Sequence, residues 1–167
     1  MLETKIILDH KLVDVMKAHA ASLFPEECCG IMLGKFENTN PLVKRMQAVK
    51  RMQNTHDKVE RYHRYTIDPR DFVRVESEGE SNGQEIIGIY HSHPNAQAEP
   101  SAFDRDRAWP VLSYIVIEVT KAGPIEMKSW TLSEDRSEFL LESMEVEDDD
   151  PGESNDLDRS RACTNQF

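Results

Sequence analysis

Residues 85–104 read EIIGIYHSHPNAQAEPSAFD, and this stretch holds the densest group of informative residues in the chain. The isoleucine-rich run from Glu85 to His93 predicts a buried β-strand. Pro94 ends this strand, because proline has no backbone N–H to donate to a sheet. Pro100 followed by Ser101 then begins a short helix, which we expect over residues 101–108.

Two histidines at the end of this strand and an aspartate at the start of the helix form a candidate metal site. His91 and His93 are two positions apart, so both imidazoles lie on the same face of the strand. Asp104 can return as a third ligand, and two histidines with one carboxylate and an open position are typical of catalytic zinc. Each part alone has a simpler explanation, because Ser101-x-x-Asp104 is also a plain helix cap and a His-x-His pair also occurs by chance. The combination of strand, proline and acidic helix start favours the metal site.

The wider pattern resembles the JAMM family of zinc metallopeptidases (MPN-plus, JAB-domain), best known as deubiquitinases. The resemblance covers residues 1–140 and rests on the motif His91-x-His93-Pro94-x6-Ser101-x-x-Asp104, with Glu27-Cys28-Cys29-Gly30 upstream. It implies that one Zn²⁺ is bound by His91, His93 and Asp104. It also implies that Glu27 is the general base for the metal-bound water, and that Ser101 helps hold the water or the developing oxyanion. In the family's motif the glutamate lies three residues before the glycine, which selects Glu27 over Glu26.

The order of apolar segments predicts an α/β fold, in which a mixed, mostly antiparallel β-sheet is flanked by α-helices. The resemblance adds a three-layer sandwich similar to that of cytidine deaminases. We expect a single metallopeptidase domain over residues 1–144 and an acidic, disordered tail over residues 145–167. The expected strands cover residues 4–8, 28–36, 42–53, 65–67, 85–93, 113–120 and 125–132, of which 42–53 lies near an edge open to self-pairing. Helices are expected after Asp9, after Asp68, at Ser101 and at Ser133 or Glu134, the last carrying Phe139, Leu140 and Met144.

Charge and cysteine content exclude several classes of function. With 20 basic and 31 acidic residues the net charge is −11, and no basic stripe alternates with aromatics, so we expect no nucleic-acid partner. Residues 142–167 hold nine acidic and two basic side chains, so most of the excess lies there. No apolar run is long enough for a transmembrane helix, and the first residues lack the pattern of a signal peptide. Three cysteines in no even-numbered framework complete the expectation of a cytoplasmic protein.

The remaining polar and aromatic residues have simpler interpretations. His19 lies on the apolar stripe of the first helix, where a satisfied core histidine is expected. Three further histidines lie in polar surroundings and are expected to be exposed: His10, His56 and His63. A cysteine nucleophile at Cys28 or Cys29 is disfavoured, because a thiol on a buried strand is usually inert. Three aromatic residues are expected in the core: Trp109, Trp130 and Tyr114.

The resemblance implies hydrolysis of the peptide or isopeptide bond after the C-terminal Gly-Gly of a ubiquitin-like protein, either a sulfur carrier or a modifier. Such a narrow tail fits a tight groove and extends as a strand against a sheet edge. The compact length looks most like the stand-alone prokaryotic members. Two alternatives stay open: a non-catalytic module of this fold that binds a ubiquitin-like partner, and a non-haem iron oxygenase, which also uses two histidines and one carboxylate. A nucleobase deaminase is disfavoured, because its His-x-Glu and Pro-Cys-x-x-Cys motifs are missing.

Overall fold

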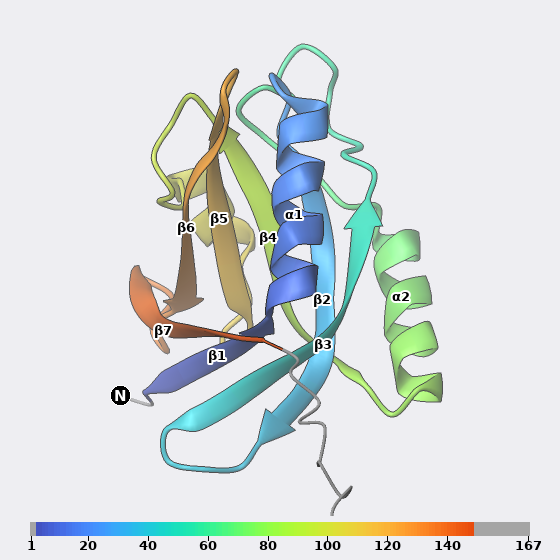
Figure 1. The fold of residues 1–167 in the computed structure, drawn as a ribbon, viewed down its shortest axis with the longest axis vertical. Coiled ribbons are helices and arrows are strands. Elements are labelled where there is room, and N and C mark those ends of the chain that lie inside the picture. The colour runs from blue at the N-terminus through green and yellow to red at the C-terminus, as the bar shows by residue number, and fades with distance from the viewer. Residues whose placement is uncertain (1–2, 149–167) are drawn as a thin grey trace, which may run out of the picture.

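The computed structural model describes residues 3–148, and within them one mixed sheet closes on itself (Figure 1). The strands are β1 (Thr4–Asp9), β2 (Cys29–Glu37), β3 (Leu42–Met52), β4 (Glu85–Pro94), β5 (Ser113–Thr120), β6 (Gly123–Leu132) and β7 (Phe139–Glu147). The helices are α1 (His10–Leu23), α2 (Pro69–Ser81) and α3 (Ala102–Arg107). Around the ring the order is β1-β3-β2-β4-β5-β6-β7, and β1 pairs with β7 to close it. The α/β class and the mixed sheet are confirmed, whereas closure into a barrel, in place of an open sheet between helical layers, was not predicted.

Strand β7 is the largest departure from the expected secondary structure. We expected a helix from Ser133 or Glu134, but Ser133 instead begins a turn in which its N–H donates to the Glu138 carbonyl at 2.9 Å. β7 then pairs antiparallel with β6 and parallel with β1. Pairing on both sides outweighs the helical spacing of the apolar residues in this segment, because tertiary context overrides local propensity. β7 ends at Glu147, beyond the expected domain boundary at residue 144, and residues 149–167 of the expected acidic tail lie outside the described residues.

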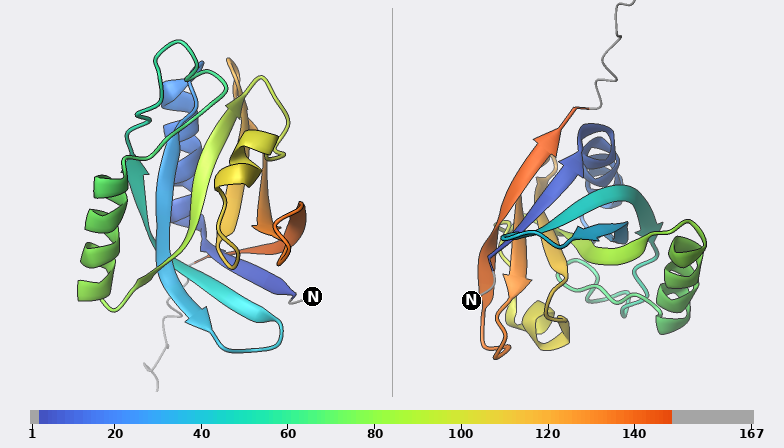
Figure 2. Two further views of the ribbon diagram at one scale, coloured as in Figure 1. Left: turned by 180° about the vertical axis from the view of Figure 1, so that it is seen from behind. Right: turned by 90° about the horizontal axis from the view of Figure 1, so that it is seen from below.

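Helices cover both faces of the curved sheet. Asp9 caps α1 by accepting from the N–H groups of Lys11 and Leu12, and Asp68 caps α2 in the same way, as expected. The apolar side of α1 packs on one face, in a core that includes Met16, while α2 packs on the opposite face. Figure 2 shows α3 on the face opposite α1. No helix within residues 3–148 has the length and apolar character needed to cross a membrane.

Strand β3 lies inside the sheet, not at an edge. It pairs with β1 on one side and β2 on the other, so the expected open edge and its self-pairing are wrong. A buried ion pair accounts for one of the charges that made this strand look peripheral: the Lys44 ammonium lies 2.9 Å from a Glu142 carboxylate oxygen on β7. Lys44 also donates to the Val111 carbonyl at 2.7 Å, while Thr4 and Ser129 donate to Glu142. A lysine whose ammonium group has these hydrogen-bond partners can be fully buried.

The segment between β3 and α2 is irregular. Residues 65–67 form no strand, contrary to our expectation, although the Thr55 N–H donates to the Thr66 carbonyl at 2.8 Å. This bond closes the segment into a loop that lies beside the carboxyl end of β4. Trp109, on the connection between α3 and β5, is 65% exposed instead of buried, whereas Tyr114 is buried as expected and Trp130 is half-buried.

Candidate metal centre and active site

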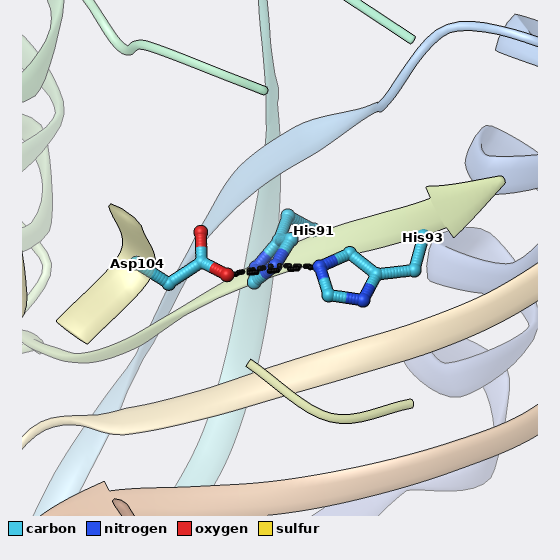
Figure 3. Close-up of side chains that lie close together, drawn as sticks. All are labelled: His91, His93 and Asp104. Carbon is cyan, nitrogen blue, oxygen red and sulfur yellow. Dashed lines mark hydrogen bonds and ion pairs between the residues drawn. The ribbon is translucent and has the colours of Figure 1, made fainter. Parts of the chain in front are cut away.

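Strand β4 and helix α3 bring three of the expected residues together (Figure 3). His91 and His93 point to the same side of β4, and their Nε2 atoms lie 3.1 Å apart. The Oδ2 atom of Asp104, in the first turn of α3, lies 3.5 Å from Nε2 of His91 and 3.6 Å from Nε2 of His93. All three side chains are buried. Three donor atoms from two elements thus converge on one point below the surface.

The spacing of these donor atoms fits a tetrahedral metal ion. Ligands about 2.0–2.1 Å from a tetrahedral zinc ion lie roughly 3.3 Å from one another, close to the spacing of the three atoms. The His93 ring is also oriented for this role, because its Nδ1 lies 2.9 Å from the Gln97 carbonyl, which leaves Nε2 facing the other ligands. His91, His93 and Asp104 can therefore hold a metal ion.

Glu27 reaches the same site from a position two residues before β2. Its Oε1 atom lies 3.8 Å from Nε2 of His93, and the residue is only 2% exposed. Its Oε2 atom is buried and has no hydrogen-bond partner within the described part of the chain. Burial raises the pKa of Glu27 to about 8, with Asp104 adding to the rise and His93 opposing it. A carboxylate held this way is an acceptor that the fold leaves unused.

Burial and mutual charge set the protonation of the three candidate ligands. Burial lowers the pKa of His91, since a charged imidazolium is costly in the interior. Burial also acts to lower the pKa of His93, but the hydrogen bond to Asp104 and the charge of Glu27 outweigh it and raise this pKa. For Asp104, burial would raise the pKa, yet the two histidines and the Ser101 N–H hold it well below its usual range. Asp104 is therefore an anion in the neutral range of pH.

Ser101 caps α3 and binds the Asp104 carboxylate. Its backbone N–H donates to Oδ2 of Asp104 at 2.6 Å and its hydroxyl donates to the same oxygen at 2.8 Å. The Asp104 N–H donates back to the Ser101 hydroxyl at 3.2 Å, which completes a capping box. The capping role that the sequence suggested is thus present, and the same bonds orient the oxygen that faces the histidines.

Two further residues support the site and were not singled out from the sequence. Tyr65 stacks on the imidazole of His91, with ring centroids 4.6 Å apart. Asn54 is buried beyond the end of β3, where its amide donates to the carbonyls of Glu27 at 3.1 Å and Arg64 at 2.9 Å. The Glu27 N–H in turn donates to the Arg61 carbonyl at 2.7 Å. Both peptide groups of Glu27 are therefore held by the loop between β3 and α2. No local sequence signal marks these residues, because their partners are distant along the chain.

Cys28, Cys29 and the other histidines lie outside this cluster. Cys28 and Cys29 are fully buried, and burial raises the pKa of Cys28 to about 11, so the thiolate needed for a nucleophile is disfavoured. His19 is a core residue, as expected, with its Nδ1 2.7 Å from the Tyr90 hydroxyl. His10 and His63 are exposed, as expected, whereas His56 is mostly covered and contacts Thr66 and Glu60.

An apolar groove leads to the site. Its volume is about 690 Å³, and it runs between α2 and α3 over the face of β4. Asp104 and Tyr65 lie in its wall, so the groove is continuous with the candidate metal centre. The other lining residues are Thr66, Ile67, Pro69, Phe72, Val73, Glu76, Ile86, Ile89, Phe103, Arg107, Trp109, Pro110 and Leu112. The exposed Trp109 thus forms part of a concave apolar surface beside the site.

Comparison with known proteins agrees with this geometry. The family described as prokaryotic homologs of the JAB domain matches residues 9–133. A desampylase of Haloferax volcanii is 32% identical over 113 residues, which cover 67% of this chain and 75% of the relative. A desampylase of Pyrococcus furiosus is 32% identical over 133 residues, which cover 78% of this chain and 83% of the relative. The solution structure of a Desulfitobacterium hafniense protein aligns with a TM-score of 0.72 and 28% identity, covering 86% of this chain and 93% of that one. The chain therefore belongs to the JAB-domain family, as a JAMM-type metallopeptidase of the stand-alone prokaryotic kind.

Proposed function

We propose that this enzyme uses Zn²⁺ to hydrolyse the peptide or isopeptide bond after the C-terminal Gly-Gly of a ubiquitin-like protein. The observation that carries the proposal is the unpaired, buried carboxylate oxygen of Glu27 beside the cluster of His91, His93 and Asp104. Two relatives are named desampylase, a name for removal of a small ubiquitin-like modifier, which supports a substrate of this class. We assign the activity to residues 1–144.

In this proposal His91, His93 and Asp104 hold one zinc ion through two imidazole nitrogens and one carboxylate oxygen. The ion supplies Lewis-acid chemistry, since it lowers the pKa of water toward about 7 and polarises a carbonyl. The hydrogen bond between His93 and the Gln97 carbonyl and the capping box around Asp104 keep two of the ligands in their orientation.

Glu27 acts as the general base and then as the general acid. Its carboxylate takes a proton from the attacking water and passes it to the leaving nitrogen. Burial favours this exchange, because in the metal-free protein it raises the pKa of Glu27 above its usual range, and a carboxylate with a raised pKa is a stronger base than an exposed one. Ser101 holds Asp104 through its backbone N–H, and in the transition state its single hydroxyl hydrogen turns from Asp104 to the developing oxyanion.

The apolar groove receives the extended tail that precedes the scissile bond. Glycine at both last positions allows a peptide backbone to approach a confined site that no larger residue would enter. Tyr65 and Ile67 line the groove, and within residues 3–148 their peptide groups donate and accept no hydrogen bond. These free groups support pairing with an extended substrate, in place of the sheet edge that we expected from the sequence.

The test is intact-mass spectrometry of a ubiquitin-like protein that carries an extension after Gly-Gly. We expect cleavage after the second glycine by the zinc-loaded enzyme, and no cleavage after chelation. Glu27→Gln should keep its zinc but lose roughly a thousandfold in kcat, because it removes the group that transfers the proton. An intact substrate with zinc-loaded wild type would contradict the proposal and favour a module that only binds such a partner. A fully active Glu27→Gln variant would contradict the role of Glu27.

A further inference from the structure

Arg107, at the end of α3, differs from every other arginine in the described part of the chain. The guanidinium groups of the other arginines donate hydrogen bonds to carboxylates or to backbone carbonyls. Within residues 3–148, Arg107 makes neither a hydrogen bond of this kind nor an ion pair. A guanidinium has five N–H donors, so its hydrogen-bonding capacity is left to water or to a ligand.

The Arg107 side chain is nevertheless held in place. Its guanidinium carbon lies 3.8 Å from the centre of the Phe103 ring, a close cation–π contact. Arg64 also contacts this ring, at 4.7 Å, but its charge is already paired with Glu60. Stacking fixes the plane of a guanidinium without using its donors. Arg107 is thus oriented by an apolar contact while its polar atoms stay available.

The position of Arg107 indicates which ligand could use its free hydrogen-bond donors. It lines the apolar groove, three residues after Asp104 on the same short helix. Much of the lining is apolar, including Phe72, Trp109 and Leu112. Arg107 is the one basic residue among the described residues that line the groove. Arg107 is itself exposed, so an anionic group that enters the groove reaches its free donors directly and gains a charge-assisted hydrogen bond.

We infer that Arg107 is a specificity residue, which recognises the carboxylate of an acidic side chain in the peptide segment before the Gly-Gly of the substrate. The inference rests on the proposed function, since it assumes that the groove receives this segment. A planar guanidinium matches a carboxylate with two parallel hydrogen bonds, and pre-orientation by Phe103 reduces the entropy lost on binding. Glu76, on the α2 wall of the groove, disfavours an acidic residue on the opposite side.

The chain offers a matched control. Arg105 lies on the same helix and carries the same charge, but it does not line the groove. Its guanidinium donates to the Ser137 carbonyl and to Asp106, both at 3.4 Å. Substitution of Arg105 changes the net charge near the site by the same amount as substitution of Arg107. A difference between the two variants therefore reports a local contact and not the overall field.

The experiment measures peptide binding by fluorescence anisotropy, with zinc-loaded full-length protein. The probes are labelled peptides ending in Gly-Gly, with a single glutamate, glutamine or lysine placed at each upstream position in turn. At one position we expect the glutamate peptide to bind roughly tenfold more tightly than the glutamine peptide. Arg107→Gln should abolish this difference, Arg107→Glu should favour the lysine peptide, and Arg105→Gln should leave the preference unchanged.

Hydrolysis of the same peptides, extended beyond the second glycine, separates this inference from the proposed function. A charge preference that depends on Arg107, without cleavage of any peptide, would uphold the inference and contradict the proposed hydrolysis. Cleavage without a charge preference would uphold the proposed hydrolysis and contradict the inference about Arg107. A preference that survives in Arg107→Gln, a loss of preference in Arg105→Gln equal to that in Arg107→Gln, or no measurable binding of any peptide would each overturn the inference.

Discussion

Two clusters of charged side chains are buried in this small domain, and they differ in how well the protein satisfies them. In the cluster of Lys44 and Glu142, each carboxylate oxygen accepts a hydrogen bond and the ammonium group has two acceptors. In the candidate metal centre, an oxygen of Glu27 and Nδ1 of His91 are buried without a partner among the described residues. The first cluster joins strands across the ring, whereas the second lies at the end of a groove.

This difference separates a structural role from a chemical one. A buried polar atom without a partner costs free energy, and at Glu27 this atom belongs to a carboxylate beside the candidate metal ligands, where a bound water can use it. A buried ion pair that is fully bonded needs no ligand and does not point to a function. Burial of charge alone would rank Lys44 as highly as Glu27, and only the count of unused hydrogen-bonding atoms distinguishes them.

Breaking the Lys44 cluster should have the largest effect on stability. Lys44→Met leaves Glu142 buried without its counter-ion, and we expect it to lower the free energy of unfolding by about 3–5 kcal/mol. The double variant Lys44→Met and Glu142→Leu should be more stable than Lys44→Met, because it removes both charges. Urea denaturation measures these values. A loss below 1 kcal/mol in Lys44→Met would mean that the pair is not the buried network described above.

The metal centre should behave in the opposite way, gaining stability from a ligand. At a free zinc concentration roughly a thousandfold above Kd, binding to the folded state adds about 4 kcal/mol to the free energy of unfolding. We expect this rise in thermal denaturation of wild type and of Lys44→Met, but not of His91→Ala. An equal rise in His91→Ala would place the metal elsewhere on the protein.

A smaller effect is expected where the loop between β3 and α2 meets Glu27. Asn54→Ala removes the amide that holds the Glu27 carbonyl, so the base shifts relative to the metal ligands. We expect kcat to fall roughly tenfold or more, with little change in KM, because substrate contacts stay in place. Asn82→Ala is the control, since this asparagine bonds only its own helix. A change in KM alone would assign Asn54 to substrate binding.

The sequence was most informative where the chemistry is local. The spacing of His91 and His93 on one strand and of Ser101 and Asp104 at one helix start predicted how these side chains are brought together. The family was likewise identified from these residues and is confirmed by the match over residues 9–133. The bonds of Asn54, by contrast, depend on segments distant in the sequence, and no local pattern encodes them.

The errors have the same origin. The apolar spacing in Phe139–Glu147 is compatible with a helix, and only the free sides of β1 and β6 make it a strand. The charges of β3 indicated an edge, because the sequence does not reveal that Lys44 would meet Glu142 inside the sheet. Trp109 was expected in the core, whereas it is exposed and lines a groove. Contacts between segments distant in the sequence thus determined these features, which the local sequence did not predict.

A third buried polar contact is intermediate between these two clusters and makes the stability of the protein depend on pH. His19 faces the Tyr90 hydroxyl inside the core, a packing made possible by Gly30, where any Cβ would lie 2.1 Å from the tyrosine ring. Burial, with a smaller contribution from Arg51, lowers the pKa of His19 to about 4. The imidazole is therefore neutral in the folded protein across the neutral range of pH. In the unfolded chain, with a pKa near 6.5, the same histidine binds a proton more readily.

Stability should consequently fall as the pH is lowered through the interval between the two values of the His19 pKa. Above pH 6.5 both states are neutral at this residue and its contribution is constant. Between pH 6.5 and about 4 the unfolded state takes up the proton first, and we expect a loss of roughly 3 kcal/mol from this residue. His19→Gln keeps a partner for Tyr90 but does not titrate. The difference between its free energy of unfolding and that of wild type, both measured by urea denaturation, therefore isolates the contribution of His19 from those of the other titrating groups. A constant difference across this interval would show that the pKa of His19 is the same in the folded and the unfolded protein, and would contradict a lowered pKa in the core.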